Sequence, residues 1–171
     1  MEHLPAWKFN ETAESYDVIL TKYYNQDKYS SVTLVIDNDH APPDVDSNGI
    51  LVTSWHHMFD GQLNIKEIIF ADTIKTDHVT STRAMFCNCP NLERIVLPPF
   101  AFRNVTDASF MFQNCPKLKE IVAPGLFLTK NTEGKYTLNE IVKKYSKRII
   151  DNTPIERIHC PVSLNMLRMD D

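Results

Sequence analysis

The sequence predicts an α/β fold, a short solenoid of stacked strands and short helical turns with helical caps at both ends. The first observation behind this prediction is a motif that recurs along the middle of the chain. The second is that each copy ends in a short run of alternating apolar residues, as in a half-buried strand. A unit of this size cannot bury its apolar side alone, so successive units must stack. We expect one domain over residues 1–171, made of an N-terminal part (1–49), the repeats (50–124) and a C-terminal part (125–171).

The repeat is defined by a Val-Thr pair, a Met-Phe pair and an Asn-Cys-Pro corner, which recur at steps of 27 and then 26 residues. The recurring pairs are Val52-Thr53, Val79-Thr80 and Val105-Thr106, followed by Met58-Phe59, Met85-Phe86 and Met111-Phe112. In each unit the Thr hydroxyl can cap a short helix that brings Met and Phe inward. The proline of the corner then ends the helix, and a strand follows. Looser copies at 61–69 and 152–161 extend the pattern at both sides.

The pattern V-T-x-x-x-x-M-F-x-x-C-x-x-L-x-x-I resembles the BspA-like leucine-rich repeat, a bacterial surface-protein type of repeat that also occurs in some protists. The resemblance covers residues 50–124 and, in a weaker form, 150–161. It implies a leucine-rich-repeat solenoid and a role in surface adhesion.

The flanks are expected to close the stack. Asn10 or Thr12 can cap a helix that runs to about Tyr24, and the β-branched run 31–36 predicts a strand. Residues 125–136 form an excursion. Thr137 then opens a capping box, and Leu138, Ile141, Val142 and Tyr145 form an apolar stripe on the helix that follows it. A last degenerate repeat and a tail end the chain.

Composition limits the class of protein. Hydrophobic residues make up 43% and charged residues 23%, and no apolar run approaches the length of a membrane span. Residues 1–10 lack the features of a signal peptide, so we expect a cytoplasmic protein with four free cysteines. Residues 1–60 carry ten acids and three bases, which disfavours nucleic-acid binding and favours a basic partner if this region has one.

Asp44, Asp46 and Asn48 precede Gly49 in the pattern D-x-D-x-N-G, which opens a calcium loop. The twelfth position of such a loop requires a bidentate Glu and is Trp55 here. We therefore favour a solvated turn and keep a metal- or small-ligand-binding module as an alternative.

The remaining candidate chemistry has structural explanations. Cys89, Cys115 and Cys160 occupy inward positions, and Cys87 is expected to be the more exposed thiol. His56-His57 stand at variable repeat positions, and no nucleophile, phosphate-binding or zinc-protease motif is present. We expect no enzyme activity and no cofactor. We interpret the basic cluster Lys143, Lys144, Lys147 and Arg148 as the solvated side of the last helix, with contact to a phosphate or an acidic partner as the alternative.

Aligning the strands places three rows of side chains on their outward face. Two rows alternate in charge: Lys66, Glu93, Lys119 and Glu156, and Glu67, Arg94, Glu120 and Arg157. The third row is apolar: Val35, Ile69, Val96 and Val122, ending at His159. Opposite charges side by side stabilise one strand register. An apolar row on an open face indicates that something covers it.

These patterns favour a non-enzymatic protein-binding module. Its predicted site is the strand face, formed by Val35, Ile69, Val96, Val122, His159, Arg94 and Glu120. One version is an intracellular inhibitor, carried by a phage or mobile element, that blocks a host protein. The alternative that the resemblance implies is a fragment of a bacterial surface or adhesion protein. The protein partner is not identified by the sequence, self-association is an open alternative, and no membrane partner is expected.

Overall fold

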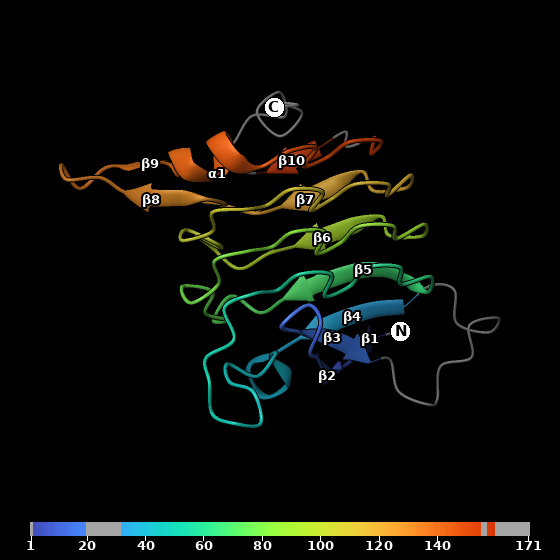
Figure 1. Ribbon diagram of the computed structural model, residues 1–171. Coiled ribbons are helices and arrows are strands. Elements are labelled where there is room, and N and C mark those ends of the chain that lie inside the picture. Colours follow the sequence, from blue (N-terminus) through green and yellow to red (C-terminus); the bar gives the residue numbers. More distant parts are fainter. Residues whose placement is uncertain (1, 20–31, 155–156, 160–171) are drawn as a thin grey trace.

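The computed structural model describes residues 2–19, 32–154 and 157–159 (Figure 1). Its elements in chain order are β1 (Glu2–His3), β2 (Ala6–Asn10), β3 (Ser15–Ile19), β4 (Val32–Ile36), the 3-10 helix η1 (Asn38–His40), β5 (Ile65–Phe70), β6 (Arg94–Val96), β7 (Glu120–Val122), β8 (Leu128–Lys130), β9 (Tyr136–Leu138), α1 (Glu140–Tyr145) and β10 (Arg157–His159). Within these residues, no helix has the length and apolar character needed to span a membrane.

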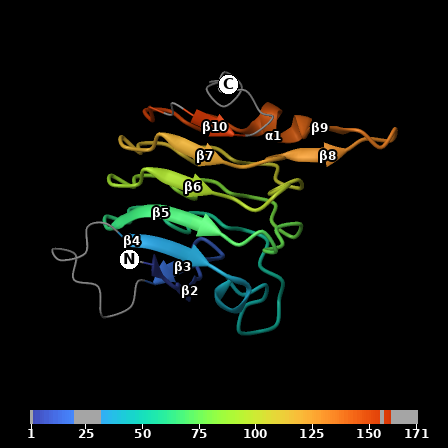
Figure 2. The same cartoon turned by 180° about the vertical axis from the view of Figure 1, so that it is seen from behind.

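The largest element is a six-stranded parallel sheet in the order β1-β4-β5-β6-β7-β10 (Figure 2). Alternation within each strand sends one set of side chains inward. Ile68, Ile95 and Ile121 are paired in register and fully buried. The strand register predicted from the sequence is thus confirmed at β5, β6 and β7. The short strand β1, which the sequence did not predict, lies at one edge.

The predicted α/β solenoid is wrong. The described residues form a mixed β structure, the parallel sheet plus two small antiparallel sheets, with almost no helix. The Met-Phe segments are turns, because each contains two residues four positions apart with φ between 50° and 74°. These pairs are His57 and Gly61, Ala84 and Asn88, and Phe110 and Asn114; the turn at residues 148–152 has the equivalent pair Arg148 and Asn152. A right-handed helix requires negative φ, so the left-handed residues interrupt it.

The turn segments are hydrogen-bonded to one another across the chain. The N–H of Phe59 donates to the carbonyl of Met85, and the N–H of Phe86 donates to that of Met111, both at 2.8 Å. Bonds within a helix would instead join residues four apart. The Thr cap and the proline stop predicted for each unit therefore have no helix on which to act.

The predicted N-terminal helix is also wrong over the described residues 10–19. Strands β2 and β3 form an antiparallel hairpin instead, and residues 20–24 lie outside the described part. The Asn10 side chain accepts hydrogen bonds from the N–H groups of Thr12 and Ala13, so it closes the hairpin turn rather than capping a helix. The hairpin covers the core, where Trp7 packs edge-on against Phe59 at 5.9 Å between ring centres.

The C-terminal part combines a confirmed helix with a corrected boundary. Residues 125–136 include β8 and the start of β9, which pair as an antiparallel hairpin. Helix α1 begins at Glu140, and its N-cap is Asn139 instead of the predicted Thr137, which lies in β9. Two carbonyls, those of Arg103 and Val105, accept hydrogen bonds from the Asn139 amide and anchor the cap. Of the predicted apolar stripe only Val142 is buried.

The core lies between the sheet and the turns. The Met and Phe residues of the three pairs expose at most 1% of their surface, as predicted. The rings of Phe59, Phe86 and Phe112 lie parallel, with centres 5.2 and 5.5 Å apart. The thiols of Cys89 and Cys115 donate to the carbonyls of Phe59 and Phe86, which satisfies two acceptors in the core.

Cys160, Glu156 and the tail predicted from residue 162 lie outside the described residues.

Candidate protein-binding face

The candidate site lies on the outward face of the parallel sheet. Strand pairing aligns the predicted apolar row of Val35, Ile69, Val96, Val122 and His159 across five strands. The first four side chains keep part of their surface exposed. The side chain of His159 lies outside the described set, although its backbone pairs with Val122. The structure thus brings the backbone of the whole predicted row together.

A charged ladder runs beside the apolar row. The guanidinium of Arg94 donates to Glu67 at 2.8 Å and to Glu120 at 2.5 Å. Arg157 lies 3.6 Å from the second oxygen of Glu120, and the hydroxyl of Thr33 donates to Glu67 at 3.3 Å. The pKa of Arg94 is raised, most strongly by its hydrogen bond to Glu67 and next by its hydrogen bond to Glu120. Because each cation lies beside an anion, the ladder leaves little net charge on this face.

The second charged row is less tightly paired. Lys66 lies 3.5 Å from Glu93, and both side chains are about half exposed. An open hollow spans both rows, lined by Thr33, Lys66, Glu67, Glu93, Arg94, Lys119, Glu120 and Arg157. Exposed pairs of this kind contribute about 0.2–1 kcal/mol each. Their main effect is to favour the observed register and to present a charged border to the apolar row.

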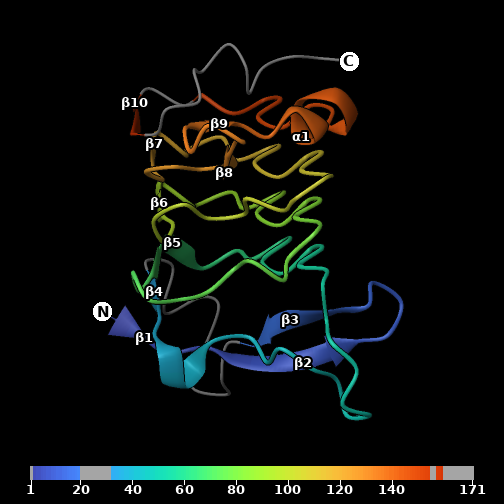
Figure 3. The same ribbon diagram turned by 90° about the vertical axis from the view of Figure 1, so that its left-hand side faces the viewer.

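Nothing in the described part of the chain forms a second layer over this face. Figure 3 shows the strands edge-on, with the turns, the β8–β9 hairpin and α1 all on the other side of the sheet. An apolar row rimmed by polar groups and open to solvent is typical of an interaction surface. The arrangement can therefore bind an apolar ridge of another molecule.

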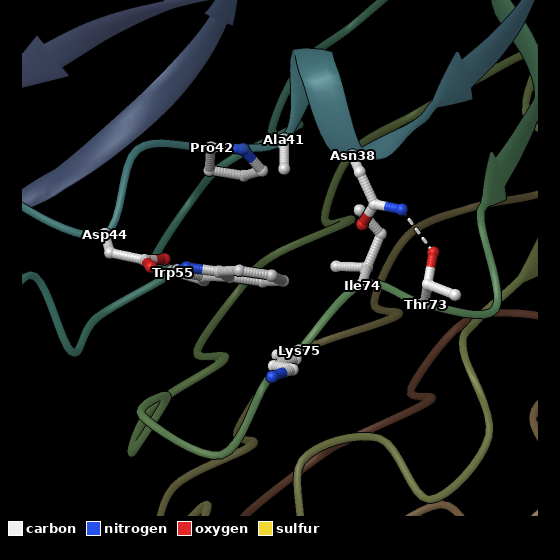
Figure 4. A pocket seen from close by; sticks show the side chains of 8 residues that line it. All are labelled: Asn38, Ala41, Pro42, Asp44, Trp55, Thr73, Ile74 and Lys75. Atoms are coloured by element: carbon white, nitrogen blue, oxygen red, sulfur yellow. Dashed lines mark hydrogen bonds between the residues drawn. The ribbon is translucent and has the colours of Figure 1, made fainter.

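A second candidate is a hollow above the indole of Trp55 (Figure 4). Its lining comes from two segments that are distant in sequence and from the tryptophan between them: Asn38, Ala41, Pro42, Asp44, Trp55, Thr73, Ile74 and Lys75. Asn38 hydrogen-bonds to Thr73 across the hollow. Sequence reasoning missed this hollow, because no local pattern predicts that residues 38–44 and 73–75 meet.

The three predicted metal ligands have separate roles in the structure. Asp44 borders the hollow, and its carboxylate lies 3.4 Å from Nε2 of His78. The Asp46 carboxylate accepts hydrogen bonds from the N–H groups of Asn48 and Ile50, which closes its own turn. Among the described residues, no group of three or more His, Cys, Asp or Glu side chains is placed to hold a metal ion.

The structure buries the described thiols and exposes the basic cluster. Cys87 exposes 6% of its surface and Cys89 and Cys115 none, so all three are buried. Burial, with a smaller effect of Asp60, raises the pKa of the Cys87 thiol to about 11, which disfavours the nucleophilic thiolate. Lys143, Lys144, Lys147 and Arg148 are exposed, as predicted.

Comparison with known proteins finds no protein-family model, no curated protein and no solved structure that matches this chain. The likeness to BspA-like repeats is therefore still a prediction from the sequence.

Proposed function

We propose that this protein is a non-enzymatic binding module whose outward sheet face docks a segment of another protein. The observation that supports the proposal is the apolar row Val35, Ile69, Val96 and Val122, aligned in register and partly exposed. Apolar area removed from water on docking contributes about 25 cal/mol per Å² before association costs are subtracted.

The spacing of the row suits an amphipathic helix laid across the strands. Neighbouring strands lie about 4.8 Å apart, so the four apolar side chains span about 14 Å. Successive turns of a helix lie about 5.4 Å apart and present apolar residues at a similar interval. A helix of about ten residues would match the row, with its polar sides toward the charged rows.

The charged ladder determines how such binding responds to salt. Arg94 is already paired with Glu67 and Glu120, so these groups offer little net field to a partner. Affinity then comes from apolar burial, and we expect it to change little with ionic strength. Binding through the acidic region of residues 1–60 would instead weaken steeply as salt is raised.

The test replaces one apolar residue of the face. Val96→Asp should abolish the capture of protein partners from the source cell, because it puts a charge in the middle of the apolar row. Leu63→Asp is the matched control, since Leu63 is an exposed apolar residue outside the row. Both variants should melt close to the parent.

Two results would contradict the proposal. One is that Val96→Asp captures the same partners as the parent. The other is that capture by the parent collapses when salt is raised, which would move the site to the acidic region.

A further inference from the structure

The loop after η1 forms a projecting apolar finger, residues 44–52. Its two arms are joined by a bridge between Val45 and Leu51, and the N–H of Val52 donates to the carbonyl of Asp44 at 2.7 Å. The Tyr16 hydroxyl donates to the carbonyl of Val45 at 2.7 Å and ties the finger to β3. The finger exposes three large apolar side chains: Val45 at 43%, Ile50 at 63% and Leu51 at 53%. These bonds hold the finger in one shape, so its apolar tip is presented to solvent.

The finger stands in an acidic part of the molecule. Residues 44–52 contain two acids and no lysine or arginine. On the finger, Asp44 is exposed and Asp46 is partly exposed. An apolar tip that carries acids fits a surface that is apolar at its centre and basic at its edge.

Helix α1 presents such a surface. Val142 packs into the core, while Ile141 and Tyr145 expose 48% and 59% of their surface. Four exposed bases lie on or just after the helix: Lys143, Lys144, Lys147 and Arg148. The helix is held in place by Ser146, whose hydroxyl accepts a hydrogen bond from the N–H of Ala108 at 2.8 Å. We call this set of six exposed residues the basic helix patch.

The two surfaces lie at opposite ends of the molecule. Figures 1 and 3 show the finger beyond the β1–β4 end of the parallel sheet and α1 at its β7–β10 end. In both views the finger and the helix are on the same side of the molecule. A second molecule displaced along the direction from β10 to β1 would therefore bring its helix toward the finger of the first.

We propose that the finger of one molecule docks on the basic helix patch of a second copy of this chain. The contact joins two different surfaces, so it is heterologous and can continue from copy to copy unless the array closes into a ring. Apolar side chains would meet at its centre, and aspartates would face lysines and an arginine around them.

A second copy explains both surfaces together. A membrane rich in anionic lipid would attract the basic helix patch but would repel the acidic finger. Both surfaces have exposed apolar residues, and their charges are opposite, which favours self-assembly over binding to a membrane.

The experiment measures the average mass of the full chain by sedimentation and light scattering over a wide range of concentration. We expect the mass to rise with concentration at low ionic strength and to fall toward the monomer in about 0.5 M salt, where exposed charges are screened. Ile141→Asp should weaken assembly at least about tenfold, because it places an acid opposite the acidic finger. Leu63→Asp, exposed to a similar degree, should assemble like the parent.

Charge exchange identifies the surfaces that meet. The finger variant Asp44→Lys/Ser47→Lys changes two exposed residues of the finger and leaves Asp46, which closes the turn, in place. The helix variant is Lys143→Glu/Lys144→Glu. Each variant alone should remain monomeric at concentrations at which the parent assembles, and their mixture should assemble, because basic fingers then meet acidic helices. Thermal melting of each variant checks that the fold is kept.

Three outcomes would overturn the inference. The first is a parent protein that stays monomeric at all concentrations at low salt. The second is a mixture of the two charge variants that assembles no more than either alone. The third is a monomeric parent that binds vesicles of anionic lipid through the basic helix patch. Val96→Asp, which tests the sheet face, should assemble normally, so the two proposals can fail separately.

Discussion

The two faces of the parallel sheet are built from neighbouring residues of similar chemistry, yet their roles differ. Ile95 points inward and is fully buried, whereas Val96, the next residue, points outward and stays partly exposed. The same contrast holds for Ile68 and Ile69 and for Ile121 and Val122. A single step along the strand therefore separates residues that hold the fold from residues available to a partner.

The largest expected effect is at the ring stack behind the inner face. Phe86→Ala removes a buried ring that lies between Phe59 and Phe112, and it should lower the free energy of unfolding by about 3–5 kcal/mol. Chemical denaturation of the parent and the variant measures the difference. Equal midpoints would mean that the stack contributes little.

The comparison of the two faces is tested directly by a pair of alanine variants. Ile95→Ala should cost about 2–5 kcal/mol because it leaves a cavity in the core. Val96→Ala should cost less than about 1 kcal/mol because solvent can fill the space. Similar losses in both variants would show that the outward row is part of the stabilising core.

The turns opposite the sheet allow a third test. Asn114 has φ of 57°, donates to the side chain of Asn88 and accepts from that of Asn152. Asn114→Ala should cost about 1–2 kcal/mol, since alanine disfavours the left-handed region. Asn114→Gly is the control: it loses the same side-chain bonds but keeps the backbone freedom, so it should cost less. If Asn114→Gly lost more stability than Asn114→Ala, backbone conformation would not explain the loss.

The outward charges should matter less than the turns. Arg94→Met removes the pairs with Glu67 and Glu120 and should cost about 1 kcal/mol in low salt, less when salt screens the ladder. Denaturation at two ionic strengths gives both values. A loss of several kcal/mol would indicate that the ladder, rather than the inner face, dominates sheet stability.

The smallest expected effect concerns pH. The pKa of His56 is lowered in the folded state, mainly by burial and to a smaller degree by the nearby His57. The unfolded chain therefore takes up a proton more readily, and stability contributed at this site should fall as the pH drops below about 6.5. Melting from pH 8 to pH 5 should show a shallower decline for His56→Asn than for the parent. If the melting temperatures of the variant and the parent fell in parallel as the pH dropped, other groups, such as the outward carboxylates, would be the cause of the decline.

The sheet could be predicted from the sequence because its signals are local. Alternation identified the inward isoleucines, and opposite charges at matched positions predicted the register that pairs Glu67, Arg94 and Glu120. The apolar row of the candidate site followed from the same alignment. Each of these inferences depends on the two-residue period of a strand and on neighbouring strands having similar sequences.

The turns and the ends could not be predicted in this way. The possible caps Asn10 and Thr12 predict a helix that runs to about Tyr24. Ser15 and Val18 instead lie in β3 of a hairpin and hydrogen-bond to the carbonyls of His56 and Met58 in a distant turn. Left-handed residues such as Ala84 and Phe110 have no sequence signature, because Ala and Phe adopt that region only when surrounding contacts require it.

The sequence by itself determined which residues of each strand face the core and which face outward, since that choice follows from the chemistry of adjacent side chains. The tertiary structure alone decided the conformation of the turns, the hollow above Trp55 and the placement of the acidic finger and the basic helix patch at opposite ends. These features join segments far apart in the chain. They depend on the free energy of long-range contacts, which no local pattern records.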